Sequence, residues 1–379
     1  MSAPTAIETP RLVLRRPSAD DAQAMFDAYA SDPEVTRFMT WTTHENVERA
    51  HAFLRRCDAV WTDGSAYPWM ITLRGRVIGI IEVRLDGHRA EIGYAIGRAA
   101  WGRGYTTEAA RVVVEWAVAR PAIRRVWAYV DAENAASARV LEKCGMTREG
   151  TVRSWFVPPA FGVPRDCFMY ARADRANEPV TPPPLTFATA VAATPANLRP
   201  RDDVRRLDTE RLVLRAPTVD DADAVFKTYA QDPLVLRYTT RGPHQRVDDT
   251  RAFLRECEEG WARGSVLSWL ITLRDDGRPI GGTNIRLDGH RGEIGYALAR
   301  SAWGQGYATE AARAVVACGL AQPDVRRVWA VCDVENEASA RVLEKTGMTR
   351  EARLRAWAVM PAFDTARDVW CYACTKEAA

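Results

Sequence analysis

The chain has 379 residues, of which 47% are hydrophobic and 27% are charged, the composition of an ordinary globular protein of two or three domains. Its 52 Lys and Arg residues against 49 Asp and Glu residues leave a net charge of only +3, which argues against the concentrated basic field of a nucleic-acid-binding protein. The sequence shows no apolar run of signal-peptide length at its start and no stretch of roughly 20 apolar residues that could span a membrane. Together with the low net charge, this leads us to expect a cytoplasmic protein that binds neither nucleic acid nor a membrane.

The first part of the chain begins with a short strand and two helices. We predict the strand over residues 11–15 and a helix that starts at Ser18, a favourable N-cap followed by acidic residues, and runs to residue 30. Pro33 ends this helix, and an amphipathic helix follows over about residues 45–60. Three strands joined by Arg-Gly and Asp-Gly turns come next, over residues 67–73, 77–85 and 89–96.

After these strands the hydrophobic period changes from strand to helix. Apolar residues between Ala109 and Ala117 recur at helical spacing, which predicts one buried stripe. A strand over residues 124–130 follows, then a helix over 136–144 that ends at Gly145. The last two strands are predicted over residues 151–157 and 165–170. These elements predict an α/β fold, with a mixed, mostly antiparallel sheet of about seven strands flanked by helices.

The whole of this pattern occurs twice. The sequence RLVLRRPSADDA returns as RLVLRAPTVDDA, and LDGHRAEIGYAIGRAAWGRGYTTEAAR returns as LDGHRGEIGYALARSAWGQGYATEAAR. We predict one domain over residues 1–173 and a second over 204–379. Residues 174–203 are rich in Pro, Ala and Thr and have no hydrophobic period, as in a linker. Two duplicated domains of this size can pack as an intramolecular pseudo-dimer.

Eight cysteines lie mostly in apolar stretches, which is typical of reduced core residues. Cys371 and Cys374 form a single Cys-x-x-Cys pair inside a segment that resembles a buried strand. A zinc site needs further ligands, and no second such pair accompanies this one. We therefore predict no metal site.

A glycine-rich loop stands between the third meander strand and the long helix of each copy. Gly102 and Gly104 of Gly-Arg-Gly-Tyr-Thr allow backbone amides at a helix start to approach an anion closely. The alternative interpretation is a tight turn that feeds a packed helix. The loop is not the pattern of a nucleoside triphosphate site, and it follows a meander instead of opening a βαβ unit. These features favour a pyrophosphate-bearing cofactor other than NAD or ATP.

The segments RLVLR, EIGY, WGRGYTTEAAR and DAENAASARVLEKCGM, with their counterparts in the second copy, cover nearly all of both domains. Through them the chain resembles the GCN5-related N-acetyltransferase (GNAT) family, in particular the RimJ/RimL-like branch that acetylates ribosomal-protein N-termini. The resemblance implies that the EIGY strand supplies backbone to a pantetheine arm and that the next loop holds the pyrophosphate of acetyl-CoA or another acyl-CoA. The residues implied are Ile96, Trp101, Gly102, Arg103, Gly104, Tyr105 and Thr106, and in the second copy Leu298, Trp303, Gly304, Gln305, Gly306, Tyr307 and Ala308.

Asparagine and serine follow the next strand in both copies. Asn134 and Asn336 can bond the pantetheine amides, although an Asn here can equally cap the following helix. Ser137 and Ser339 lie in the first turn of that helix, where a hydroxyl can donate to a departing sulfur or merely bond its own backbone. Because Gln305 replaces Arg103, we expect somewhat weaker phosphate binding in the second copy.

Acyl transfer to an amine also needs a group that removes the ammonium proton. We choose Glu91 and Glu293, which occupy matching places on the EIGY strands, with a structural carboxylate as the alternative interpretation. Glu82 is a rival base in the first copy, but its counterpart is Asn284.

The resemblance therefore implies an N-acyltransferase that moves acetyl from acetyl-CoA to a primary amine by direct attack. The resemblance also implies that the acceptor is an amine-bearing small molecule, a peptide or a protein, and that the loops around residues 39–44 and 157–164 form its pocket. Two alternatives stay open. One is transfer of a longer acyl group from acyl-CoA or a carrier protein, and the other is that one copy is a non-catalytic CoA-binding scaffold.

Overall fold

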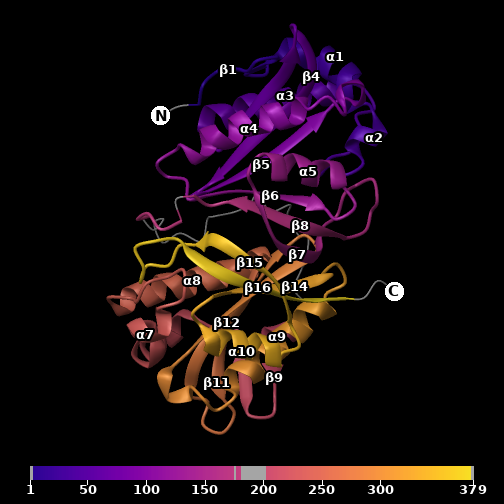
Figure 1. Ribbon diagram of the computed structural model, residues 1–379. Helices are drawn as coiled ribbons and strands as arrows, with labels where there is room; N and C mark the ends of the chain where they lie inside the picture. Colours follow the sequence, from indigo (N-terminus) through magenta and orange to yellow (C-terminus); the bar gives the residue numbers. More distant parts are fainter. Residues whose placement is uncertain (1–2, 175, 181–201, 377–379) are drawn as a thin grey trace. The chain divides into compact units, whose positions relative to one another are not determined.

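The computed structural model describes residues 3–174, 176–180 and 202–376. Two compact units make up the chain, the first holding the residues up to Val180 and the second most of the residues after it. Both units carry the same succession of elements (Figure 1), as the repeated sequence predicts. Most of the linker predicted over 174–203 lies outside the described residues.

The first unit contains strands and helices in the predicted order. Its strands are β1 (Ala6–Glu8), β2 (Leu12–Arg15), β3 (Ala66–Leu73), β4 (Arg76–Asp86), β5 (Arg89–Ile96), β6 (Arg125–Asp131), β7 (Thr147–Phe156) and β8 (Arg165–Arg172). Its α-helices are α1 (Ala22–Met25), α2 (Pro33–Thr36), α3 (Val47–Asp63), α4 (Tyr105–Val118) and α5 (Ala135–Lys143). The 3₁₀ turns η1 (Ala19–Asp21) and η3 (Arg98–Ala100) and the π-helical segment η2 (Phe26–Ala30) complete the unit.

The second unit repeats this order. Its strands are β9 (Arg206–Asp208), β10 (Leu212–Arg215), β11 (Val266–Leu273), β12 (Pro279–Asp288), β13 (Arg291–Leu298), β14 (Arg327–Asp333), β15 (Thr349–Ala358) and β16 (Arg367–Thr375). Its α-helices are α6 (Ala222–Val225), α7 (Pro233–Leu236), α8 (Val247–Arg263), α9 (Tyr307–Ala321) and α10 (Glu337–Lys345). Its 3₁₀ and π segments are η4 (Asp202–Arg205), η5 (Val219–Asp221), η6 (Phe226–Ala230) and η7 (Arg300–Ala302).

The strands of each unit form a mixed sheet in which one neighbouring pair is parallel. In the first unit the spatial order is β1-β2-β3-β4-β5-β6-β8-β7, and among its described strands only β5 and β6 run parallel. In the second unit the order β9-β10-β11-β12-β13-β14-β16-β15 repeats this topology, with β13 and β14 parallel. The predicted α/β fold with a mostly antiparallel sheet is confirmed. Each unit has the seven predicted strands and one more, the three-residue strand at its start.

Helices cover both faces of the first sheet (Figure 1). Ile80 and Ile81 are neighbours on β4, so their side chains point to opposite faces. Ile81 packs in a core cluster with Val113 of α4, whereas Ile80 packs in a cluster with Leu54 of α3. The helix that follows the glycine-rich loop is therefore fixed to one face of the sheet by buried apolar contacts, which hold its first turn in place.

The predicted helix over residues 18–30 is not continuous. It is divided into η1, α1 and the π-helical η2, and Pro33 begins the short helix α2 with Asp32 as its N-cap. The Ser18 backbone N–H donates to the Asp21 carboxylate at 2.8 Å, and Asp21 also pairs with Arg15 at 2.5 Å. Burial alone would raise the pKa of Asp21, but the bonds from Arg15 and Ser18 outweigh it, so this pKa lies below its usual value. Asp221 of the second unit has the same arrangement.

Low pH should therefore destabilise the first unit through Asp21 and the second unit through Asp221. Because the folded-state pKa lies below the unfolded value of about 3.9, the folded form binds fewer protons, and its stability falls as the pH drops through the folded-state pKa. We expect the Asp21→Asn/Asp221→Asn variant to have a lower Tm at pH 7 and a flatter Tm profile between pH 5 and 3. The exposed Asp20→Asn/Asp220→Asn variant is the control. Parallel profiles for all three proteins would contradict the assignment.

Candidate active site

The sheet of each unit opens between its two parallel strands. In the described residues, β5 and β6 are paired only over three positions, of which the last is Glu91 opposite Trp127, although β5 continues to Ile96. The second unit repeats this, because the pairing of β13 with β14 ends at Glu293. Beyond that rung the facing strand edges do not hydrogen-bond to each other, so their backbone groups are available to an extended ligand.

The glycine-rich loop follows the open edge of β5 and leads into α4. Gly102 and Gly104 have φ values of +72° and +77°, and Gly304 and Gly306 have +74° and +83°, a left-handed conformation that favours glycine. A Cβ on Gly102 or Gly304 would meet no protein atom within 4 Å, so this side of the loop is open space. Gly104 is the N-cap of α4, which leaves the unpaired amides of the first helical turn beside the loop.

Trp101 folds back onto the strand that precedes it. Its indole Nε1–H donates to the Ile96 carbonyl at 2.8 Å, and Trp303 makes the same bond to Leu298 at 2.7 Å. The Trp101 ring is still 46% exposed, which is unusual for so large an apolar side chain. Two residues predicted to touch the cofactor are thus joined to each other, and the indole presents an apolar surface next to the loop.

Asn134 and Ser137 lie together at the start of α5. The Asn134 side-chain oxygen accepts a bond from the Ser137 backbone N–H at 3.1 Å, as a helix cap does, and Asn336 accepts from Ser339 at 3.2 Å. The capping bond uses only the oxygen of the side chain. The amide –NH₂ of Asn134 can still donate to a ligand, so capping and cofactor binding use different atoms.

Tyr94 of β5 contacts this serine. Its hydroxyl lies 2.8 Å from Ser137 Oγ, and the matching pair, Tyr296 and Ser339, lies at 2.9 Å. Burial raises the pKa of both tyrosines well above its ordinary value, so the phenol stays protonated at neutral pH. The hydrogen bond joins β5 to α5 at the level where the sheet opens.

Glu91 and Glu82, the two candidate bases of the first unit, contact the same arginine. The Arg84 guanidinium lies 3.2 Å from Glu91 Oε1 and 3.2 Å from Glu82 Oε1. Both carboxylates are therefore at the same place, and position alone does not choose between them. In the second unit Asn284 stands in place of Glu82, and Glu293 lies 3.9 Å from Arg286. The second unit thus has one carboxylate where the first has two.

The two predicted catalytic residues of each copy lie on opposite faces of the sheet. Glu91 and Tyr94 are three residues apart on one strand, so their side chains point to opposite faces. Because Ser137 is bonded to Tyr94, the structure does not bring Glu91 and Ser137 into contact. It places them on either side of the opening.

The predicted acceptor loops of each unit meet through aromatic rings. The ring centroids of Phe38 and Phe161 are 5.7 Å apart, and the Arg37 guanidinium lies 5.4 Å from the Phe161 ring. Tyr238 and Phe363 form the same contact at 5.6 Å. Aromatic and cation–π contacts thus hold the two segments together.

Several residues of the site escaped the sequence analysis as functional candidates. They are Tyr94, Tyr296, Arg84 and Arg286, and their contacts are described above. The available signal was their repetition within EIGY and RLDGH in both copies. Gln305 was one of the residues predicted to touch the cofactor. Its side-chain amide bends back onto its own loop and donates to the Ser301 carbonyl at 2.7 Å.

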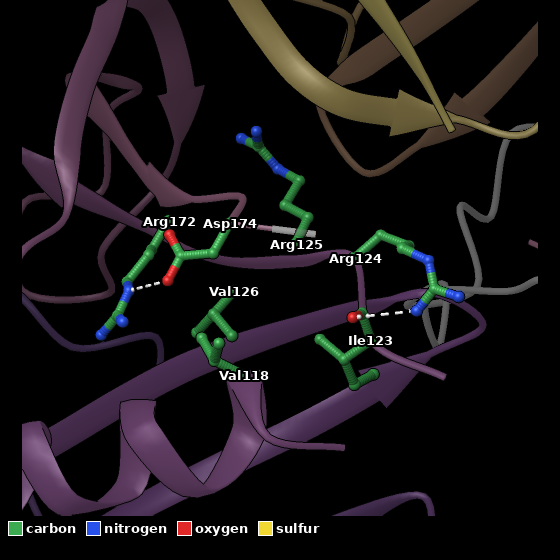
Figure 2. A pocket seen from close by; sticks show the side chains of 7 residues that line it. All are labelled: Val118, Ile123, Arg124, Arg125, Val126, Arg172 and Asp174. Atoms are coloured by element: carbon green, nitrogen blue, oxygen red, sulfur yellow. Dashed lines mark hydrogen bonds and ion pairs between the residues drawn. The ribbon is translucent and has the colours of Figure 1, made fainter. Parts of the chain in front are cut away.

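A small hollow lies at the other end of α4 (Figure 2). Its lining residues are Val118, Ile123, Arg124, Arg125, Val126, Arg172 and Asp174. Arg172 pairs with Asp174 at 2.6 Å, and the pocket is too narrow to admit water. Because α4 separates it from the glycine-rich loop, it is not part of the candidate site.

Cys371 and Cys374 lie in β16, as the predicted buried strand requires, and all eight cysteines are free thiols. Within residues 3–174, 176–180 and 202–376, no three His, Cys, Asp or Glu side chains are grouped so as to hold a metal ion. None of the helices in this described part has the length and apolar character needed to cross a bilayer.

Both copies match one family model, and similar proteins cover a little less than half of the chain. The family model of an acetyltransferase (GNAT) domain matches residues 11–147 and 211–349. The uncharacterised N-acetyltransferase p20 of Bacillus licheniformis is 31% identical over 39% of this chain and 85% of its own length. YoaA of Bacillus subtilis, also an uncharacterised N-acetyltransferase, is 31% identical over 44% of this chain and 94% of its own. A crystal structure of a GNAT-family acetyltransferase from Bacillus anthracis is 28% identical, covers 45% of this chain and 98% of its own, and has a TM-score of 0.40.

Proposed function

The chain belongs to the GNAT family of acyl-CoA-dependent acetyltransferases, and we propose that each of its copies transfers acetyl from acetyl-CoA to a primary amine by direct attack. The observation that carries this proposal is the opening between β5 and β6. It has a carboxylate on one face and a tyrosine–serine pair on the other. An acyl group held in the opening can be reached by an amine from the carboxylate face while its sulfur faces the hydroxyl groups.

Residues of the loop and the open strand edge suit the cofactor. The amides around Gly102 and Gly104 would hold the diphosphate, for which the open side of the loop leaves room. The free edge of β5 and the Asn134 –NH₂ would bind the amides of the pantetheine arm. When bound, acetyl-CoA supplies an activated thioester.

In this proposal Glu91 takes up the proton of the attacking amine. A carboxylate can accept it directly or through one water molecule, and the ion pair with Arg84 fixes its position. Glu293 has the same role in the second copy, without a neighbour equivalent to Glu82. Loss of this proton makes the nitrogen lone pair available to the acyl carbon, which becomes the carbon of the new amide.

In this proposal the Ser137 hydroxyl donates a hydrogen bond to the departing thiolate. In the proposed arrangement the Tyr94 hydroxyl donates to Ser137 Oγ, and not to the Ser137 carbonyl 3.2 Å away, which leaves the serine's own proton directed toward the sulfur. Burial raises the pKa of Tyr94, so the phenol keeps the proton that this bond needs. Ser339 and Tyr296 repeat the pair.

The acceptor is a primary amine on a small molecule, a peptide N-terminus or a protein lysine. Free thiols at all eight cysteines suit a reducing cytoplasm, where such acceptors are abundant. Intact-mass spectrometry of a panel of amines incubated with the chain and either acetyl-CoA or long-chain acyl-CoAs tests the proposal. We expect a mass gain of one acetyl group. Exclusive use of long chains would replace acetyl transfer with acylation by a longer group.

A further inference from the structure

Arg11, in the repeated RLVLR segment between β1 and β2, reaches across to the glycine-rich loop. Its Nη1 donates to the Arg103 backbone carbonyl at 3.0 Å, and its guanidinium lies 4.6 Å from the centroid of the Tyr105 ring. Residues 103 and 105 flank Gly104, the N-cap of α4. One side chain from the start of the domain thus contacts the loop on both sides of its second glycine.

Glu108 holds this arginine in place. Its Oε1 accepts from Thr9 Oγ1 at 2.6 Å and from the Arg11 backbone N–H at 2.9 Å, while its Oε2 accepts from Arg11 Nε at 2.6 Å. Burial opposes ionisation of Glu108, but the bonds from Thr9 and Arg11 outweigh it and lower its pKa. The carboxylate, which lies in the first turn of α4, is therefore ionised and paired.

The second copy preserves the arrangement although the loop sequence differs. Arg211 Nη1 donates to the Gln305 carbonyl at 3.0 Å, pairs with Glu310 at 2.8 Å and lies 4.6 Å from the Tyr307 ring. Thr209 donates to Glu310 at 2.6 Å. Because the loop side chain is Arg in one copy and Gln in the other, the arginine recognises backbone, and its role concerns the shape of the loop.

Two physical effects follow from these contacts. The C=O and N–H of a trans peptide point in opposite directions, so a carbonyl of residue 103 held toward Arg11 directs the Gly104 N–H away from it. In addition, an unpaired Glu108 would repel an anion bound at the helix start, and Arg11 neutralises that charge. Both effects favour a diphosphate on the loop.

The structure assigns to Arg11 and Arg211 the role of positioning residues, which hold the loop amides and neutralise the first-turn carboxylate so that the diphosphate can bind. This inference rests on the proposed function, because it takes the loop to be the diphosphate site. The arginines act through the loop and need not touch the reacting atoms.

Kinetics of the full chain with two donors test the assignment. For Arg11→Gln/Arg211→Gln we expect the KM for acetyl-CoA to rise roughly tenfold or more with a smaller change in kcat, the scale of a lost charge-assisted hydrogen bond. With acetyl-pantetheine, which lacks the diphosphate, KM should not change. Arg11→Lys/Arg211→Lys should be intermediate, because Lys keeps the charge but lacks the planar fork. Adding Glu108→Gln/Glu310→Gln to the Gln variant should recover part of the loss.

Arg16→Gln is the matched control. Arg16 also pairs with a carboxylate, that of Asp58 at 2.5 Å, and lies 5.3 Å from the Trp61 ring, but these contacts are away from the loop. We expect unchanged KM values for both donors. Equal rises of KM for acetyl-CoA and acetyl-pantetheine in the Arg11/Arg211 variants, or no rise for either, would overturn the assignment. A wild-type chain inactive with both donors would instead overturn the proposed function.

Discussion

The variant Glu91→Gln/Glu293→Gln is expected to lose about 10²–10⁴-fold in kcat for acetyl transfer at neutral pH, the usual contribution of a positioned general base. Glutamine keeps the size of the side chain and can still accept a bond from Arg84 or Arg286, so the sheet and the cofactor loop should stay intact. The KM for acetyl-CoA should therefore change little. Steady-state rates between pH 6 and 9 measure the effect, because raising the pH deprotonates the amine without help and should restore part of the lost rate.

The single variants separate the work of the two copies. If both copies turn over equally, Glu91→Gln and Glu293→Gln should each retain about half of the wild-type rate, as expected for independent sites. A passive second copy predicts instead that Glu91→Gln loses nearly all activity and Glu293→Gln none. Glu82→Gln is the matched control, because Glu82 contacts the same Arg84 from β4, the strand next to that of Glu91. A full loss in Glu82→Gln with little loss in Glu91→Gln would transfer the role of base to Glu82.

The fold could be predicted from the sequence wherever the patterns were local and long. The helical periodicity between Ala109 and Ala117 predicted the helix that the structure shows as α4. The predicted Arg-Gly turn before β4 is also present, with left-handed φ values of +50° at Arg74 and +76° at Gly75. The strand Ala6–Glu8 escaped because three residues are too few to show alternation. The change from α-helix to π-helix at Phe26 was not predicted either. A π-helical segment differs from an α-helix in its backbone hydrogen bonds, and the pattern of apolar residues does not reveal that difference.

The candidate site could be predicted one residue at a time, but its geometry could not. Gly102, Asn134 and Ser137 could be chosen as candidates because each belongs to a local turn or helix start. The Glu91 side chain points to one face of the sheet and Ser137 lies on the other, and this separation is visible only in the folded structure. The place where β5 and β6 separate is set by pairing between residues that are distant in the sequence. The contact of Arg11 with residue 103 spans 92 positions, and no local pattern encodes it.

Substitution of the first loop glycine should remove one cofactor site from the chain. Gly102→Val places a β-branched side chain at φ +72° and fills the open space beside the loop amides, so we expect calorimetric titration with CoA to give one site per chain in place of two. Gly304→Val should have the same effect on the second copy, and the double variant should bind no CoA. If Gln305 weakens the second copy, the site that survives in Gly102→Val should have the larger Kd.

The variant Gly75→Val separates the effect of backbone strain from the loss of a CoA-binding site. Gly75 has a φ of +76° and, like Gly102, would meet no protein atom within 4 Å of an added Cβ, but it lies in the β3–β4 turn. Both substitutions force a left-handed conformation that costs roughly 1–2 kcal/mol, so their Tm values should fall together. Only Gly102→Val should change the number of bound CoA molecules. Two sites with unchanged Kd in Gly102→Val would mean that the loop does not hold the diphosphate, whatever its effect on Tm.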